Sequence, residues 1–372
     1  MRFRKGIYKK QNIMWYRKTV SHKKIIKIRE KIMVIRILKA LFVIIGTLIG
    51  AGFASGQEIY IFFYKYGIQG ILGIIISSLV LGIVAYKVPN ICKNNEIKNY
   101  KDFLNIFVRN EKQLNIINTI INIFILISFY IMIAGFGAYF EQQFGINSLI
   151  GSLILAIICY FVFLKDVSGL IKINQFIVPI LIGSLFMIGI HVIEVKHIFQ
   201  ISNYILPNTS WKWILDSILY GSYNTILLIP VLIALRNLIN HKKENIIIAI
   251  LTTIFVILLS LIIFFMLMKI DVNIENLEMP AVYIASKISE IWKYIYGFII
   301  LSAILTTSVS LGTSFLENVV KTKKYYKQYA IFICISAVII SKIGFSNLVN
   351  LLYPIFGYIG LIQIIKIVTI KK

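Results

Sequence analysis

Hydrophobic residues lie along this chain in long runs, and short polar connections separate the runs. We count ten apolar segments of about 16–28 residues, close to the about 20 residues with which a helix crosses the hydrocarbon core of a membrane. The pattern predicts an all-α integral membrane protein with about ten transmembrane helices. With boundary errors of about 2–4 residues, the expected spans are 37–64, 68–88, 115–140, 147–164, 169–192, 211–238, 245–268, 291–316, 329–344 and 347–368.

Two of the connections have a pattern of their own. Residues 96–112 place aromatic and aliphatic side chains at helical intervals, which predicts an amphipathic helix that lies on the membrane or on the bundle. Residues 271–290 form a long connection after the seventh span, for which we expect a short re-entrant or surface helix. The remaining connections leave no room for a soluble catalytic domain.

The composition agrees with a membrane protein and explains the high charge. Hydrophobic residues make up 59% of the chain, against about 45–50% in a soluble domain. The net charge of +24 could indicate nucleic-acid binding, but 32 of the 39 Lys and Arg lie on the side of the predicted topology that holds both termini, and 7 lie on the other. This distribution follows the positive-inside rule. We therefore expect cytoplasmic termini, anionic lipid headgroups as partners and no nucleic acid.

The first residues are interpreted separately. Met33 begins an apolar run, so residues 1–32 are read as a basic cytoplasmic extension or a misassigned start, and residues 33–372 as the transmembrane domain. A cleaved signal peptide is the alternative. High Ile, Lys and Asn usage indicates an AT-rich bacterial genome and hence a bacterial cell membrane. The three Cys and four His are scattered without metal or redox spacing.

The first apolar segment carries an interruption at Gly46–Glu58, which reads GTLIGAGFASGQE. Glycine lowers helix stability, and a carboxylate such as that of Glu58 is costly at membrane depth. Non-helical backbone survives there only inside the protein or beside a cavity. The segment therefore predicts a broken helix whose free backbone groups bind a solute. The alternative is that the glycines form only a helix-packing face.

A second interruption is expected in the sixth span. Residues Gly221–Thr225 are small or polar, Pro230 follows them, and Asn224 could cap the second half of the helix. The first and sixth spans hold matching places in 37–192 and 211–368, two repeats of five spans with opposite orientation. Paired breaks in an inverted repeat indicate a transporter site.

The sequence IGTLIGAGFASGQEI, the order of the spans, the break at Gly221–Thr225 and the Thr306-Thr307 pair resemble the YkvI family of bacterial membrane proteins. That family is similar to the amino acid–polyamine–organocation (APC) superfamily, with a LeuT-like five-plus-five inverted repeat. The resemblance implies that helices 1 and 6 hold the substrate and that helices 3 and 8 form the opposite wall. The substrate-binding candidates are Gly50, Ala51, Gly52, Ser55, Gly56, Tyr130, Gly221, Tyr223 and Asn224.

The same resemblance implies a sodium site. Its candidates are the carbonyls of Ala51 and Ala54 together with the hydroxyls of Thr306 and Thr307. The alternative is that these hydroxyls bond their own helix. Tyr130 likewise either contacts a substrate carboxylate or packs in the bundle with its hydroxyl satisfied.

Glu58 has two interpretations as well. Ser55-Gly56-Gln57-Glu58 fits the S-x-x-E capping box, in which the glutamate reaches back to a backbone N–H. The functional interpretation makes Glu58 a gate or a proton carrier.

These observations predict a secondary active transporter of a small solute, an amino acid or related zwitterion, that works by alternating access without a cofactor. Sodium is the favoured coupling ion, and a proton-coupled carrier is the alternative. A second class is a non-transporting sensor or assembly protein that retains the fold. The sequence lacks H-E-x-x-H, G-x-S-x-G and phosphate-loop motifs, so an enzyme or primary pump is not expected.

Overall fold

The computed structural model of the protein describes residues 27, 30–97, 100–108, 110–164, 168–195, 211–237, 239, 241–270, 272–320 and 322–369. Within these ranges the chain is helical apart from turns and short connections, and they contain no β-strand. The basic segment 1–32 lies almost wholly outside the described residues, as does most of the loop 193–210.

Every expected span coincides with helical structure. The first span consists of a helix over residues 30–48 and the short helices α2 (Ala51–Ala54) and α3 (Gln57–Phe62). The others are α4 (Ile68–Asn94), α6 (Glu111–Phe144), α7 (Ser148–Phe163), α8 (Ser168–Val195), α9 (Lys212–Ala234), α10 (Lys242–Leu267), α12 (Glu290–Val319), α13 (Lys323–Ser341) and α14 (Phe345–Thr369).

The lengths and surfaces of these helices fit a membrane. In the described part of the chain, α4, α6, α9, α10, α12 and α14 are each long and apolar enough to cross one, and α7 and the Pro179–Val192 part of α8 are shorter apolar helices. Large apolar side chains such as Leu72, Met187 and Phe298 are more than half exposed on outer helix faces. Soluble proteins rarely leave so much apolar surface uncovered. The chain is a multi-pass membrane protein.

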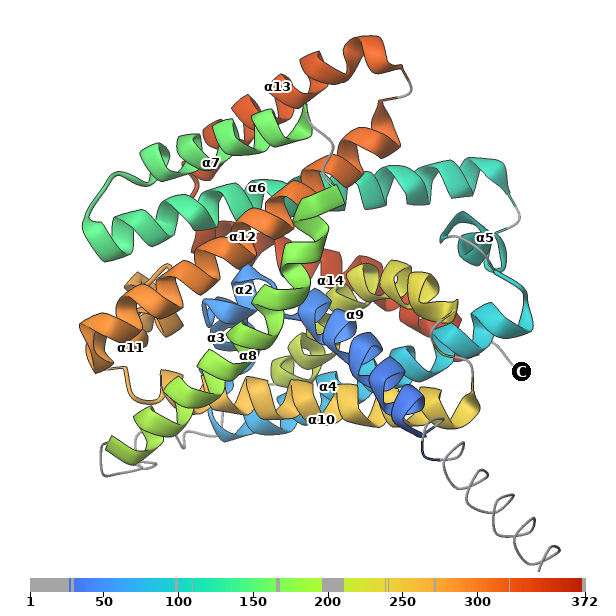
Figure 1. Ribbon diagram of the computed structural model, residues 1–372, viewed down its shortest axis with the longest axis horizontal. Helices are drawn as coiled ribbons and strands as arrows, with labels where there is room; N and C mark the ends of the chain where they lie inside the picture. The colour runs from blue at the N-terminus through green and yellow to red at the C-terminus, as the bar shows by residue number, and fades with distance from the viewer. Residues whose placement is uncertain are drawn as a thin grey trace, which may run out of the picture.

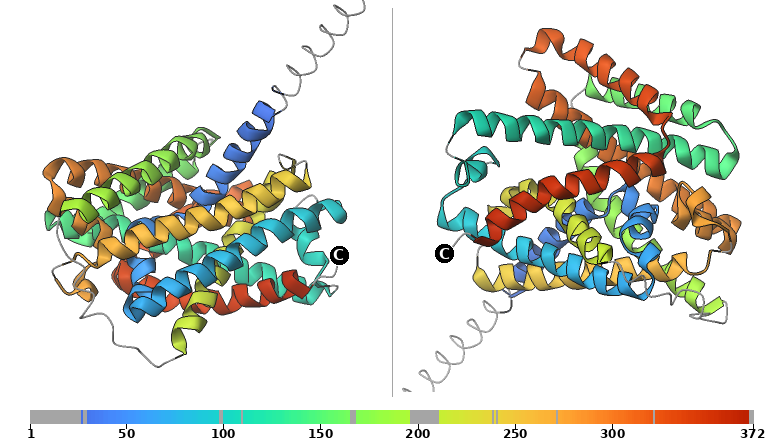
Figure 2. Two further views of the ribbon diagram at one scale, coloured as in Figure 1. Left: turned by 90° about the horizontal axis from the view of Figure 1, so that it is seen from below. Right: turned by 180° about the vertical axis from the view of Figure 1, so that it is seen from behind.

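Most of the long helices form two groups, with the broken part of the first span between them (Figure 1), and α8 contacts both α12 and α10. The α6 group contains α6, α7, α12 and α13, and the α9 group contains α4, α9, α10 and α14, with extensive packing inside each group. Helix α2 contacts α12, whereas α3 contacts α9, α10 and α14. Figure 2 shows the same arrangement from below and from behind. The interruption therefore lies where the two groups meet.

Two short helices lie in the connections that the sequence singled out. Helix α5 (Tyr100–Asn105) buries Phe103 and Leu104 and contacts α9, and Gln363 of α14 donates a 3.1 Å hydrogen bond to the Tyr100 hydroxyl. The amphipathic helix is thus confirmed, although it is shorter than 96–112. Helix α11 (Pro280–Ile288) follows the seventh span and packs mainly against α12.

The expected break in the sixth span is wrong. Helix α9 runs without interruption from Lys212 to Ala234 and includes Pro230. The polar side chains that suggested a break bond back to carbonyls of their own helix instead: Thr225 Oγ1 lies 2.8 Å from the Gly221 carbonyl oxygen, and Ser222 Oγ lies 2.6 Å from that of Ile218. Such bonds satisfy polar groups inside an apolar environment without unwinding the helix.

Candidate functional site

The first span is interrupted twice within eight residues. The helix over residues 30–48 stops before Ile49 and Gly50, and α2 then forms a single turn. A second turn at Ser55 and Gly56 separates α2 from α3. Gly56 has a φ of 84°, in the left-handed region that glycine adopts at little cost. The glycines therefore mark a real change of chain direction, and the prediction of a broken first helix is confirmed.

Hydrogen bonds fix the second turn, but not as a capping box. Ser55 Oγ donates to the Gly52 carbonyl (2.9 Å) and accepts from the Gln57 N–H (3.3 Å). The carbonyl of Ser55 accepts from the N–H of Ala281 in α11 (2.8 Å), so the connection after α10 is docked on the break. The capping-box hypothesis is wrong, because Gly56 is the N-cap of α3 and Ser55 binds the turn.

Gly50 and Gly52 have very different surroundings. A Cβ atom built on Gly50 would meet no atom within 4 Å, so the chain borders open space there, and Gly50 is partly exposed. A Cβ atom on Gly52 would lie 2.3 Å from Glu58 Oε1. One side of the break is thus open, and the other is filled by a carboxyl group that needs a glycine opposite it.

Glu58 lies in the interior with only 3% of its surface exposed. Tyr223 of α9 donates a short hydrogen bond to Oε2, and Tyr220 and the backbone N–H of Phe53 also bond the carboxyl. In the described part of the chain no Lys, Arg or His pairs with it. A buried carboxylate normally pairs with a cation. A carboxyl group whose hydrogen-bond partners are all neutral fits one of two roles: it exchanges a proton, or it links the segments that bond to it.

Aromatic rings enclose this carboxyl. The Tyr223 ring lies 4.7 Å from that of Tyr353 in α14 and 5.7 Å from that of Phe62 in α3, measured between centroids. Tyr220 packs edge-on against Tyr223 at 5.5 Å. Tyr223 therefore connects α9 to both α3 and α14. The sequence did not identify Tyr220 and Tyr353 as candidates. A tyrosine in an apolar helix does not indicate which residue its hydroxyl will bond.

The other candidates on α9 do not bond residues of the break directly, although Asn224 bonds the Tyr220 side chain. A Cβ atom on Gly221 would lie 3.1 Å from Val80 Cγ1, so this glycine allows close approach of α4. Asn224 Nδ2 donates to the Tyr220 carbonyl within α9 at 3.1 Å and caps no second half-helix. Of the three candidates on α9, Tyr223 is the one that the structure brings to the break.

Tyr130 of α6 is engaged elsewhere. Its hydroxyl lies 2.7 Å from Ser336 Oγ of α13, within the α6 group, and its side chain is buried. The packing interpretation of this tyrosine fits the structure.

The sodium candidates lie on α2 and on α12, two helices that contact each other. The carbonyl of Ala51 accepts the N–H of Ser55 (2.8 Å), and that of Ala54 accepts the hydroxyl of Tyr296 in α12 (2.5 Å). Thr306 is buried and its hydroxyl lies 3.0 Å from the Ser302 carbonyl oxygen, whereas Thr307 is half-buried. Tyr296 was missed in the sequence. Among the described residues no cluster of three or more His, Cys, Asp or Glu could hold a metal ion.

Solved structures indicate the fold. The Eremococcus coleocola manganese transporter, solved in complex with an aromatic bis-isothiourea compound, superposes with a TM-score of 0.53 at 11% identity, over 90% of this chain and 78% of that one. A substrate-bound, outward-open Na⁺-coupled sialic acid symporter matches at 16% identity over 87% and 75% of the two chains, but its TM-score of 0.44 is too low to indicate a shared fold. The chain thus shares the fold of the manganese transporter.

Sequence relatives indicate the family. No family model matches the chain. The protein YyaD of Bacillus subtilis (strain 168) is 23% identical over 87% of this chain and 94% of its own length. The membrane protein YkvI of the same organism is 32% identical over an alignment of 331 positions, and the match covers 86% of this chain and 92% of that protein. With this identity along nearly the whole of both proteins, the chain belongs to the family of the membrane protein YkvI.

Proposed function

We propose that this protein is a secondary active transporter of a small solute that works by alternating access. The observation that carries the proposal is the double interruption of the first span, which lies between the two helix groups, borders open space at Gly50 and buries Glu58 on its other side. Discontinuous helices at membrane depth are how secondary transporters build their sites. The shared fold with a manganese transporter supports the same reading.

The topology we propose has ten spans in two inverted repeats of five, in a bacterial cell membrane with both termini cytoplasmic. It is supported by the match of each expected span to helical structure and by the 32 to 7 distribution of Lys and Arg. The LeuT-like assignment rests on the order of these helices, with one difference from the expected pattern: the first span is interrupted, whereas α9, the sixth, is continuous.

The solute we propose is an amino acid or a related zwitterion. At the break the chain offers backbone groups, the Ser55 hydroxyl and the tyrosines around Glu58, and no Lys or Arg among the residues that the structure describes pairs with Glu58. A solute with a large negative charge would find no matching partner there. A small molecule that carries both signs, or none, fits better.

The coupling ion has two candidates. Sodium would be held by the carbonyls of Ala51 and Ala54 and the hydroxyls of Thr306 and Thr307, since hard cations take oxygen ligands. The proton would be carried by Glu58, whose neutral partners favour exchange of a proton over binding of a metal. Sodium coupling predicts that solute binding depends on the sodium concentration, whereas proton coupling predicts that it depends on pH.

Thermal unfolding of the purified full-length protein tests the proposal. The unfolding temperature is measured in sodium chloride or choline chloride, over a range of pH, with a panel of amino acids and related solutes. A ligand that binds only the folded state raises this temperature by mass action. A shift with one solute that grows with sodium supports a sodium-coupled carrier, and a sodium-independent shift that varies with pH supports Glu58. Uptake of the shifting solute into proteoliposomes must follow, and failure of every solute in both assays contradicts the proposed function.

A further inference from the structure

Three neighbouring helices of the α9 group each carry a lysine at the same end of the molecule. Helix α4 lies between α10 and α14, and the final turns of α4 and α14 lie beside the first turn of α10 (Figure 2). In the predicted topology this end of the bundle is the one that holds both chain termini. The lysines are Lys87 of α4, Lys243 of α10 and Lys366 of α14.

Lys87 connects α4 to the end of α14. Its Nζ donates hydrogen bonds to the carbonyl oxygens of Val368 at 2.6 Å and Ile367 at 3.4 Å. Carbonyls in the last turn of a helix lack partners within the helix and carry partial negative charge. Lys87 is therefore held where the two helices meet, beside the turn that carries Lys366, by dipoles that do not neutralise its full charge.

A second hydrogen bond fixes the start of α10 beside the same part of α4. The Asn245 side chain donates to the carbonyl oxygen of Tyr86 at 2.8 Å. Tyr86 immediately precedes Lys87, and Asn245 follows Lys243 by two residues. Each helix thus places a lysine within one turn of this bond. Because lysine side chains are long and flexible, the three ammonium groups can reach a common anion.

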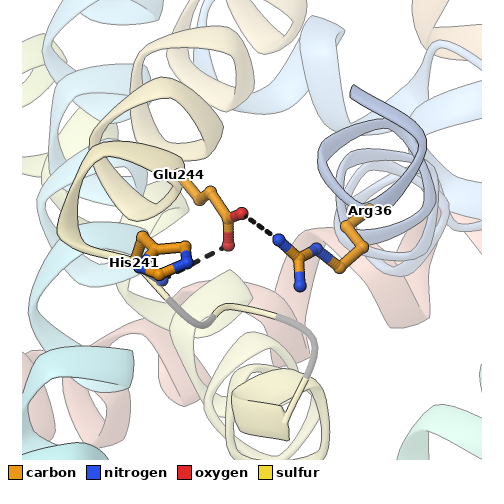
Figure 3. Close-up of polar contacts among 3 residues, drawn as sticks. All are labelled: Arg36, His241 and Glu244. Atoms are coloured by element: carbon orange, nitrogen blue, oxygen red, sulfur yellow. Dashed lines mark hydrogen bonds and ion pairs between the residues drawn. The ribbon is translucent and has the colours of Figure 1, made fainter. Parts of the chain in front are cut away.

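The acid next to Lys243 does not compensate this charge, because it is already engaged. Glu244 Oε1 lies 2.5 Å from Arg36 Nη2, and its other carboxylate oxygen accepts the backbone N–H of His241 at 3.3 Å. Figure 3 shows the Glu244 carboxyl between these two partners. Among the residues that the structure describes, no ion pair includes any of the three lysines. Their charge is left for an anion from outside the chain.

Apolar surface lies directly beside each lysine. On every one of the three helices an exposed isoleucine lies one turn from the lysine, toward the middle of the span. A lysine in this position lays its stem along the hydrocarbon while its ammonium group reaches the level of the headgroups. The surface therefore offers positive charge at headgroup level and apolar contact below it. The isoleucines are Ile83 of α4, Ile247 of α10 and Ile362 of α14.

We propose that the ends of α4, α10 and α14 form a binding site for one phospholipid with an anionic headgroup. The lipid phosphate binds the ammonium groups of Lys87, Lys243 and Lys366, and the acyl chains lie along the exposed isoleucines. Basic groups between the ends of spans are suited to anionic headgroups. A bound lipid of this kind links three helices of the α9 group, which a diffuse attraction between the membrane and a basic surface would not do. The site does not depend on the proposed transport.

Native mass spectrometry of the delipidated full-length protein in detergent tests the site. The added probes are phosphatidylglycerol, phosphatidylcholine with the same acyl chains, and inorganic phosphate. The site variant combines Lys87→Gln, Lys243→Gln and Lys366→Gln. The control variant removes the same charge from exposed lysines at the starts of α6 and α13, on the same side of the predicted topology: Lys112→Gln, Lys324→Gln and Lys327→Gln.

We expect the parent protein to bind one phosphatidylglycerol in preference to phosphatidylcholine. The site variant should bind phosphatidylglycerol about tenfold or more weakly, because three charges near the headgroup are lost, and the control variant should stay within about twofold of the parent. Arginine at the same three positions keeps the charge and should keep the binding. Inorganic phosphate should not displace the lipid, because it lacks the apolar contact.

Four results would overturn the proposal. An unchanged affinity in the site variant would place the lipid elsewhere, and an equal loss in the control variant would mean diffuse attraction only. Equal binding of phosphatidylcholine would show that the lysines do not select the headgroup. Displacement by inorganic phosphate at the concentration of the lipid would make this a site for free phosphate. If the site variant does not fold, the exposed Lys243→Gln alone decides, since it must still weaken binding. No transport is measured, so a failure here leaves the proposed function untouched.

Discussion

Replacing Gly52 by alanine tests how closely the Glu58 carboxyl is held against the break. The added methyl carbon would lie 2.3 Å from Glu58 Oε1 and 3.0 Å from the two carbons nearest to it in that side chain. Non-bonded carbon atoms prefer about 3.5–4.0 Å, so the carboxyl must retreat by about 1 Å. Gly50→Ala is the matched control, because a Cβ atom there has no neighbour within 4 Å.

The expected loss of stability in Gly52→Ala follows from the hydrogen bonds that break when the Glu58 carboxyl moves away. The carboxyl of Glu58 and the N–H of Phe53 would each lose a partner, and an unsatisfied buried group costs about 1–3 kcal/mol. Alanine regains about 1 kcal/mol of helix propensity over glycine. We expect Gly52→Ala to lower the free energy of unfolding by about 2 kcal/mol or more on these figures, and Gly50→Ala to stay within about 1 kcal/mol of the parent.

Thermal unfolding of the purified variants measures the difference. One kcal/mol corresponds to about 2–4 °C in a domain of 150–250 residues and to less in a longer chain, so a shift of a few degrees is expected for Gly52→Ala. In a Glu58→Ala background the methyl group has room, and the Gly52 substitution should cost nothing further. Equal shifts at the two glycines, or an undiminished cost in the Glu58→Ala background, would refute the geometry.

Three other substitutions have expected outcomes. Tyr223→Phe removes a hydroxyl donor from the buried Glu58 and should lower stability by about 1–3 kcal/mol, measured by thermal unfolding; no change would mean that the hydroxyl does not stabilise the carboxyl. Thr307→Ala should abolish a sodium-dependent rise in unfolding temperature, and a rise equal to that of the parent would remove Thr307 from the sodium site. Burial raises the pKa of Glu278, in the connection before α11, above its ordinary 4.5, and Glu141 adds to the rise. The folded state then holds this proton more tightly than the unfolded chain. The parent should therefore lose stability relative to Glu278→Gln as the pH rises through and above about 4.5, and parallel pH profiles would contradict this.

The spans and the first break could be predicted because their signals are local. A run of apolar residues such as that of α10 has no alternative use in a soluble fold. At the break, Gly56 adopts a left-handed conformation, and the carboxyl group of Glu58 follows two residues later. Together they leave the chain few conformations inside a membrane. Both inferences needed only the sequence of one segment.

The sixth span could not be predicted in the same way, because small and polar residues have two uses in a membrane helix. Gly221 allows α4 to approach, and Thr225 bonds the carbonyl one turn earlier. The same residues beside Pro230 would also suit an unwound segment. Which use applies depends on what packs against the helix, and one segment of sequence does not contain that information.

The tyrosines that contact the break could not be predicted for the same reason. Tyr130, on the third span, bonds Ser336 within the α6 group, while Tyr296, further along the chain, reaches the carbonyl of Ala54. Both are tyrosines in apolar helices, and depth alone did not distinguish them. Only the rotation of each helix about its axis decides which hydroxyl faces the break.

Tyrosines from both helix groups reach the break, and this bears on how the protein moves. Tyr296 holds the end of α2 from the α6 group through one hydrogen bond, and Tyr223 holds Glu58 from the α9 group. On the α9 side, Tyr220 and ring packing by Phe62 add to the contact. A single neutral hydrogen bond contributes only about 0.5–1.5 kcal/mol. If the groups move relative to each other, α3 should therefore travel with the α9 group, and the contacts of α2 with α12, including that between Tyr296 and Ala54, must be remade.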